Sequence, residues 1–305
     1  MESNKRISEL LVETGAYKDL DKPVILTSGE LGIYFINTEK LMQDGGKFNE
    51  YGEAPQAMIK HAVQMMKEHP TFEEVIDILA EQVNSLFPED AGVKVISGGQ
   101  RRDWIFSGPI AHKLGMPHIS LYKDGKLEYT SKAVDGVLVE TNAPLSVYSV
   151  HIADLMTLGS SAYDPRNDPP TGWIPMLRNK GIIIKDYLTV VTRLQGGEEI
   201  IKQSGVDCHA QVAIDINFLN DFSKDPTTAR AYQQDPTAWS RYYLKENGAT
   251  ALVSAFNPEG DKLPRAQKFI NMYGKHLTEV GKFDELNNAV KEAYGKEIDE
   301  ILGGE

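Results

Sequence analysis

Short apolar runs separated by polar loops dominate the middle of the chain. Runs of this length that are rich in β-branched residues predict strands, and residues spaced by three and four between them predict amphipathic helices. The wholly apolar run 182–184 is typical of a strand buried on both faces of a parallel sheet. The alternation predicts an α/β fold. We expect strands at 93–97, 117–122, 136–141, 181–185 and 210–216, and helices near 103–114, 146–158 and 188–204.

The two ends of the chain have a different pattern. Before the α/β region, the spacing predicts a helix over 6–20, strands around 24–26 and 33–36, and helices over 54–67 and 71–86, the last opened by a capping box of Thr71 and Glu74. After residue 220 no strand-like run appears, and residues 276–302 carry one apolar helical face. The C-terminal part is therefore expected to be helical.

Composition and charge exclude several classes of protein. The 305 residues are 41% hydrophobic and 25% charged, as in ordinary globular proteins. A formal net charge of −12 argues against nucleic acid or an anionic membrane surface as a partner. The single cysteine, Cys208, excludes an intramolecular disulfide. Because Glu9 and Glu13 interrupt the N-terminal segment and no apolar run approaches about 18 residues, we expect a cytoplasmic, soluble protein.

Common catalytic and metal motifs are absent from the sequence. The seven histidines show no HExxH spacing, and no GxSxG, Walker or GxGxxG run occurs. His151 and Asp154 have a spacing that could present two metal ligands on one helical face, although such a lone pair is usually structural. We therefore expect no metal ion held by the protein itself.

Two segments carry candidate chemistry. Asp186 follows a predicted strand, where an acid can accept hydroxyl groups, and Thr189 and Thr192 at a predicted helix start could hold phosphate; the alternative is that Asp186 only caps the helix. The second segment, 97–103, follows another strand. Its small residues Gly98 and Gly99 let an anion approach the backbone, and Arg101 and Arg102 offer donors, of which one could equally form a surface ion pair.

Three segments, in the right order, resemble type I phosphoribosyltransferases, and orotate phosphoribosyltransferases in particular. IIIKDYLTVVT (182–192) resembles their motif for phosphoribosyl pyrophosphate (PRPP), LTSGELGIYFIN (26–37) their N-terminal segment over the base, and residues 93–126 their pyrophosphate loop with its flanking strands. The resemblance covers roughly residues 1–220. It implies a mainly parallel sheet flanked by helices, with an N-terminal hood at about 1–50 and a helical C-terminal extension at 221–305.

The resemblance also implies an activity, the transfer of ribose 5-phosphate from PRPP to a nucleobase such as orotate. Magnesium would be carried by the substrate, and the protein would be a homodimer. The implied roles are ribose binding by Asp186, 5′-phosphate binding by Thr189 and Thr192, pyrophosphate binding by Arg101 or Arg102 beside Gly98 and Gly99, a mobile loop with Lys123 and Lys126, and contact with the base by Tyr34 and Phe35. Lys123 and Lys126 also fit an ordinary hairpin turn.

Three positions depart from the family pattern. Lys185 replaces the first of two acids, Val191 replaces a loop glycine, and Thr27 replaces a lysine. A β-branched Val191 would crowd a phosphate. These departures keep two alternatives open: a non-catalytic sensor of a nucleotide or base, and a diverged enzyme that uses Arg101, Arg102 and Lys185 on another phosphorylated substrate.

Overall fold

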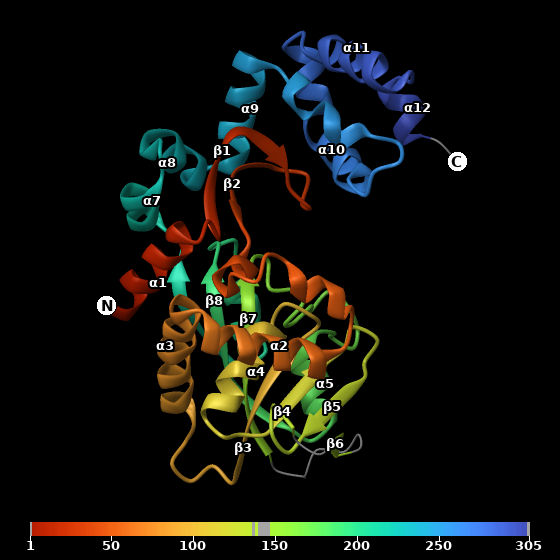
Figure 1. The fold of residues 1–305 in the computed structure, drawn as a ribbon. Helices are drawn as coiled ribbons and strands as arrows, with labels where there is room; N and C mark the ends of the chain where they lie inside the picture. The colour runs from red at the N-terminus through yellow and green to blue at the C-terminus, as the bar shows by residue number, and fades with distance from the viewer. Residues whose placement is uncertain (1, 136–137, 140–146, 304–305) are drawn as a thin grey trace. The chain divides into compact units, whose positions relative to one another are not determined.

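The computed structural model describes residues 2–135, 138–139 and 147–303 (Figure 1). The chain forms two compact units. The first contains residues 1–17 and 37–215, and the second contains residues 18–36 and 216–305. The N-terminal segment thus leaves the first unit for one strand pair and then returns to it.

The first unit is built on a seven-stranded sheet with the order β6-β5-β4-β3-β7-β8-β9. The strands are β3 (Val93–Gly99), β4 (His118–Leu121), β5 (Leu127–Thr130), β6 (Leu138–Val139), β7 (Val147–Met156), β8 (Ile183–Thr192) and β9 (Asp207–Ala213). β4, β3, β7, β8 and β9 run parallel, and β5 is antiparallel to both of its neighbours, β4 and β6. The predicted mainly parallel α/β sheet is confirmed.

The helices of the first unit are α1 (Glu2–Glu13), η1 (Thr38–Met42), η2 (Lys47–Tyr51), α2 (Pro55–Glu68), α3 (Pro70–Leu86), α4 (Trp104–Lys113), α5 (Trp173–Asn179) and α6 (Gly197–Gln203). Apolar residues of α5 and α6 form one core with Val95, Val147 and Ile184 of the sheet. The prediction of a capping box at Thr71 is wrong, because Pro70 occupies the first turn and His69 is the N-cap. The helix predicted over 6–20 ends at Glu13, since residues 17–20 belong to β1.

Two predicted helices are wrong at the centre of the sheet. Residues 147–156, expected to be helical, form β7, and residues 188–192 extend β8 before α6 begins at Gly197. The helical prediction interprets the polar residues of β7 as the solvent-facing side of a helix, but they do not face water. Ser149 and His151 are buried, and both form side-chain hydrogen bonds with Ser97 of β3. The strand predicted at 136–141 lies partly outside the described residues, and the part described is β6.

The second unit combines a strand pair with helices. Its elements are β1 (Tyr17–Ile25), β2 (Leu31–Ile36), α7 (Ile216–Phe222), α8 (Pro226–Gln234), α9 (Pro236–Asn247), η3 (Thr250–Phe256), α10 (Leu263–Glu279), α11 (Phe283–Tyr294) and α12 (Ile298–Leu302). Ile25 and Leu31 of the strand pair share a core with Phe256 and Phe269 of the helices. The strand pair, expected as part of an N-terminal hood of the first domain, therefore packs as one unit with the C-terminal helices.

Candidate functional site

A cavity of about 490 Å³ lies within the first unit, at the carboxyl ends of β3 and β7. These strands are neighbours, but the chain passes from β3 to β4 on one side and reaches β7 on the other side only later. The two connections therefore diverge here, and this divergence is where ligands bind in open α/β sheets. The cavity is lined by residues from the loop after β3, the β4–β5 turn, the end of β7 and α5: Gln100, Arg101, Arg102, Asp103, Lys123, Ala153, Asp154, Leu155, Ser161 and Trp173, with Glu39 and Tyr187.

Asp103 joins the two strands below this cavity. Its buried carboxylate accepts the backbone N–H of Gly99 at 3.1 Å and that of Asp154 at 2.9 Å. Burial raises the pKa of Asp103 to about 6, although both hydrogen bonds act in the opposite direction. The carboxylate thus fixes the loop after β3 against the end of β7.

Asp154 is a second buried acid at the cavity. Its carboxylate accepts the Thr38 hydroxyl at 2.8 Å, and the Arg102 Nε lies 3.6 Å away. Burial, and then the nearby Asp103 carboxyl, raise the pKa of Asp154 to about 7. Near neutral pH, this pair of acids can therefore accept hydrogen bonds and can also exchange a proton.

The two predicted arginines have different surroundings. The Arg101 guanidinium donates to the Gly52 carbonyl at 3.3 Å and to the Asn49 side chain, and it lies 5.0 Å from the centre of the Phe48 ring. Arg102 is exposed and pairs with Asp154 alone among the described residues. A ligand would have to replace only the ion pair with Asp154 in order to bind the Arg102 guanidinium. Arg102 is therefore a more available hydrogen-bond donor than Arg101.

Gly98 and Gly99 are required by packing. A Cβ on Gly98 would lie 2.2 Å from the Ser107 hydroxyl oxygen, and one on Gly99 would lie 2.4 Å from the Trp173 ring. Since Trp173 also lines the cavity, the second glycine lets an aromatic wall stand directly against the end of β3. Gly99 therefore stands against the cavity wall, whereas Gly98 allows β3 to pack closely against α4.

The loop after β7 is a feature that the sequence analysis missed. Within the described part of the chain, the backbone N–H groups of residues 158–161 and the hydroxyls of Thr157, Ser160 and Ser161 have no hydrogen-bond partner. Gly159 has a φ of +73°, which brings the loop against Gly197. Such a row of open donors can hold an anion. The small, hydroxyl-rich run after Asp154 was the available signal, but reading 146–158 as a helix concealed it.

Four predicted site residues lie on β8, outside the cavity. Asp186 accepts the Tyr148 hydroxyl at 3.1 Å and pairs with His209 at 2.9 Å. The predicted helix start at Thr189 and Thr192 is wrong, because both residues belong to β8: the Thr189 hydroxyl donates to the Val191 carbonyl at 3.0 Å, and Thr192 accepts the N–H of Leu194 at 3.2 Å. Lys185 is an exposed residue near the start of the same strand.

The remaining predicted residues divide between the two units. Lys123 lines the cavity, whereas Lys126 pairs with Glu128 at 2.5 Å and lies 4.8 Å from the centre of the Tyr122 ring. Tyr34 and Phe35 belong to β2 of the second unit. There Tyr34 is buried against Tyr232, with ring centres 6.0 Å apart, while Phe35 is 46% exposed.

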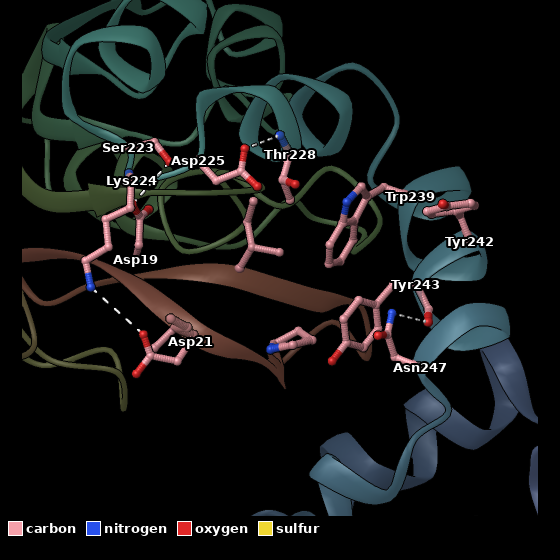
Figure 2. A pocket seen from close by; sticks show the side chains of 13 residues that line it. Asp19, Asp21, Ser223, Lys224, Asp225, Thr228, Trp239, Tyr242, Tyr243 and Asn247 are labelled. Atoms are coloured by element: carbon pink, nitrogen blue, oxygen red, sulfur yellow. Dashed lines mark hydrogen bonds and ion pairs between the residues drawn. The ribbon is translucent and has the colours of Figure 1, made fainter.

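A second cavity, of about 430 Å³, lies within the second unit beside the β1–β2 hairpin (Figure 2). Trp239 and Tyr243 stack on its wall, with ring centres 5.3 Å apart and an interplanar angle of 22°. Two of its three acids have hydrogen-bond partners in the protein: Asp19 accepts the Ser223 hydroxyl at 3.1 Å, and Asp225 caps α8. The third, Asp21, is exposed and lies 3.9 Å from the Lys224 ammonium.

The sequence of this chain is similar to that of a known phosphoribosyltransferase. No family model matches the chain. An adenine phosphoribosyltransferase from Roseiflexus sp. (strain RS-1) is 33% identical over 159 residues, which cover 48% of this chain and 85% of that protein. The chain belongs to the type I phosphoribosyltransferase family. This confirms the family inferred from the sequence motifs.

Solved structures of the same family are also similar to this chain. One is orotate phosphoribosyltransferase from Aeropyrum pernix, with a TM-score of 0.47 and 17% identity, covering 70% of this chain and 98% of that one. Another is adenine phosphoribosyltransferase from Thermoanaerobacter pseudethanolicus, with a TM-score of 0.37 and 17% identity, covering 60% of this chain and 89% of that one. The names of these relatives state two different bases.

Among the described residues, no three or more His, Cys, Asp or Glu side chains gather in a way that could hold a metal ion. Within the same residues, no helix is both long enough and apolar enough to cross a membrane.

Proposed function

We propose that this phosphoribosyltransferase-like protein binds PRPP at the carboxyl ends of β3 and β7 and transfers its ribose 5-phosphate to a nucleobase. The observation that carries the proposal is the combination of three kinds of group around one cavity. The buried carboxylate of Asp154 lines the cavity with the cations Arg102 and Lys123, and it precedes the loop of open donors at 157–161, of which Ser161 also lines the cavity. PRPP needs these three contacts for its ribose hydroxyls, its 5′-phosphate and its pyrophosphate.

Each group has a distinct task in this proposal. Asp154 accepts the ribose hydroxyls, and the donors of the loop 157–161 hold the 5′-phosphate. Arg102 leaves Asp154 and binds the pyrophosphate, with Arg101 and Lys123 beside it. These cations stabilise negative charge on the leaving pyrophosphate as its bond to the ribose breaks. In this proposal the loop at 157–161 binds the 5′-phosphate, the role first expected for Thr189 and Thr192. Asp154 binds the ribose, the role first expected for Asp186.

Magnesium fits this site as an ion bound to the substrate. The three carboxylates that line the cavity, those of Glu39, Asp103 and Asp154, each accept a hydrogen bond within the protein, and oxygen ligands are what magnesium prefers. The oxygens of PRPP and water would therefore supply most of its ligands. Bound there, the ion would neutralise charge on the pyrophosphate.

We propose that the protein is a homodimer and that the acceptor is a nucleobase such as adenine or orotate. Adenine and orotate are the two acceptors to compare, because the similar proteins are named for these bases. Size-exclusion chromatography with light scattering at micromolar concentration tests the proposed homodimer. A measured mass equal to that of one chain would refute it.

The decisive experiment titrates the purified protein with PRPP and magnesium in a calorimeter. Adenine or orotate is then added in parallel, and released pyrophosphate is measured. We expect saturable binding that Asp154→Asn abolishes and that the matched variant Asp164→Asn retains, because Asp164 is a partly buried acid that pairs with Arg166 outside the cavity. No binding of PRPP by the wild-type protein would refute the proposal.

The same experiment separates the proposed enzyme from a sensor. Asp154 is the one acid at the end of β7, since the residue before it is Ala153. One ribose contact is therefore lost relative to a pair of acids, and this favours the sensor as the second candidate. PRPP binding without pyrophosphate release on addition of either base would support it.

A further inference from the structure

His151 occupies an unusual place, in the middle of the central strand β7 and below the candidate site. Its side chain is fully buried. Tyr187, which lines the cavity, stacks on the imidazole with ring centres 4.8 Å apart and an interplanar angle of 27°. Within the described chain, the Nε2 atom of His151 has no hydrogen-bond partner. A buried polar atom without a partner destabilises the folded state, so its presence requires a reason.

A chain of hydroxyl groups determines which ring nitrogen carries the proton. The Ser149 hydroxyl donates to the Ser97 oxygen at 2.8 Å, and that oxygen lies 3.0 Å from Nδ1 of His151. Because Ser97 accepts from Ser149, its own hydrogen is available to Nδ1. An imidazole that accepts at Nδ1 carries its proton on Nε2. Burial lowers the pKa of His151 to about 3, so the ring is neutral at physiological pH.

The Nε2–H group faces Asp103. The distance from Nε2 to the Asp103 Oδ2 is 3.8 Å, which is too long for a hydrogen bond. A shift of about 1 Å would complete the bond. The same carboxylate holds the backbone N–H groups of Gly99 and Asp154, so any movement of Asp103 is transmitted to both walls of the cavity.

We infer that His151 is a positioning residue, whose Nε2–H is the donor that Asp103 accepts when a phosphorylated ligand enters the site. The inference rests on the proposed function. In the free protein Arg102 shares Asp154 with the Thr38 hydroxyl, and the ligand draws Arg102 away. Asp103 then moves toward His151, and the loop after β3 closes with it. A neutral donor suits this task because it adds no charge beside the reacting centre.

Histidine-ring ¹⁵N spectra of the full chain test this directly. In the free protein, His151 should be neutral with its proton on Nε2. On saturation with PRPP and magnesium, that proton should shift downfield and exchange more slowly with water. His118 is the internal control: it is equally buried, but Ser107 and Ser120 already face its two ring nitrogens at 2.9 and 3.3 Å, so its signals should not change in this way.

Two variants supply a second readout. His151→Leu removes the donor, and the dissociation constant for PRPP should rise about tenfold, as expected for one lost hydrogen bond. His151→Gln keeps an N–H on a side chain of similar length and should remain within about threefold of the wild type. Since the spectra use the wild-type protein, the test does not depend on either variant folding.

The outcomes separate this inference from the proposed function. No PRPP binding by the wild-type protein refutes the proposed function, and the ligand-driven movement with it. PRPP binding that leaves the His151 signal unmoved, or that His151→Leu does not weaken, overturns the role of His151 alone. A proton on Nδ1 in the free protein also overturns it, whatever binds.

Discussion

The backbone N–H of Asp154 donates to the Asp103 carboxylate at 2.9 Å, across the point where the strand connections diverge. This bond makes the end of β7 and the loop after β3 a single structural element. Both carboxyls are buried, and the pKa of each is raised, to about 6 for Asp103 and about 7 for Asp154. Burial therefore destabilises the charged forms of both acids at the point where the two strands are joined.

Asp154→Asn should separate stability from function. Burial raises the pKa of Asp154 from 3.8 to about 7, so between these values the folded protein keeps a proton that the unfolded chain has released. Stability therefore falls as the pH rises through this window and stays lower above it. The variant removes this penalty, and at pH 8 it should be about 1 to 2 kcal/mol more stable than the wild type while losing PRPP binding.

Urea denaturation at pH 4.5 and pH 8 measures the effect. The advantage of the variant should shrink toward the lower pH, where the wild-type carboxyl is protonated in the folded state. An advantage that is equal at both values would show that Asp154 titrates normally.

The two adjacent arginines should respond differently to alanine substitution. Arg102 has an exposed guanidinium with one weak partner, so Arg102→Ala should weaken PRPP binding by about 1.5 to 3 kcal/mol and change stability little. Arg101 is held by Gly52 and stacks on Phe48, so Arg101→Ala should lower stability by about 1 kcal/mol. Calorimetric titration and thermal melts of both variants check this, and equal binding losses would contradict it.

Gly159→Ala tests the loop after β7. A Cβ there would lie 2.8 Å from the Gly197 carbonyl oxygen, and the φ of +73° is itself unfavourable for alanine. Gly205 has the same φ with no atom within 4 Å of such a Cβ, so Gly205→Ala isolates the cost of the conformation, about 1 to 2 kcal/mol. Only Gly159→Ala should also weaken PRPP binding, by about tenfold or more. Equal PRPP affinity in the two variants would remove the loop from the site.

The sequence analysis predicted the loop after β3 because its signals are local. Gly98, Gly99 and the two arginines directly follow a short apolar run; in the structure both arginines line the cavity, Gly99 packs against its wall, and Gly98 packs against α4. The family was also recognised from local motifs. The loop and the family could be predicted because the residues that indicate them are close together in the sequence, so no knowledge of distant contacts was needed.

The end of β7 was not predicted because its environment is set by distant residues. Ser149 and His151 are buried next to Ser97, more than 50 positions away in the chain, so their polarity says nothing about exposure. The polar spacing then resembled a helix, and the ligand motif was assigned to β8 instead. There Asp186 has partners on both neighbouring strands, Tyr148 and His209, which sequence spacing alone cannot reveal.

Lys123 and Lys126, three positions apart in the β4–β5 turn, should differ in function. The backbone N–H of Lys123 donates to the Gln100 side chain at 2.9 Å, which holds the residue at the cavity, whereas the Lys126 Nζ is paired with Glu128. Lys123→Ala should therefore lower kcat/KM for PRPP by about ten- to a hundredfold, because a cation facing the leaving pyrophosphate is lost. Lys126→Ala should leave kcat/KM within about twofold, since its surface ion pair is worth little. Steady-state pyrophosphate release decides between them, and a larger loss for Lys126→Ala would mean that the turn rearranges when the substrate binds.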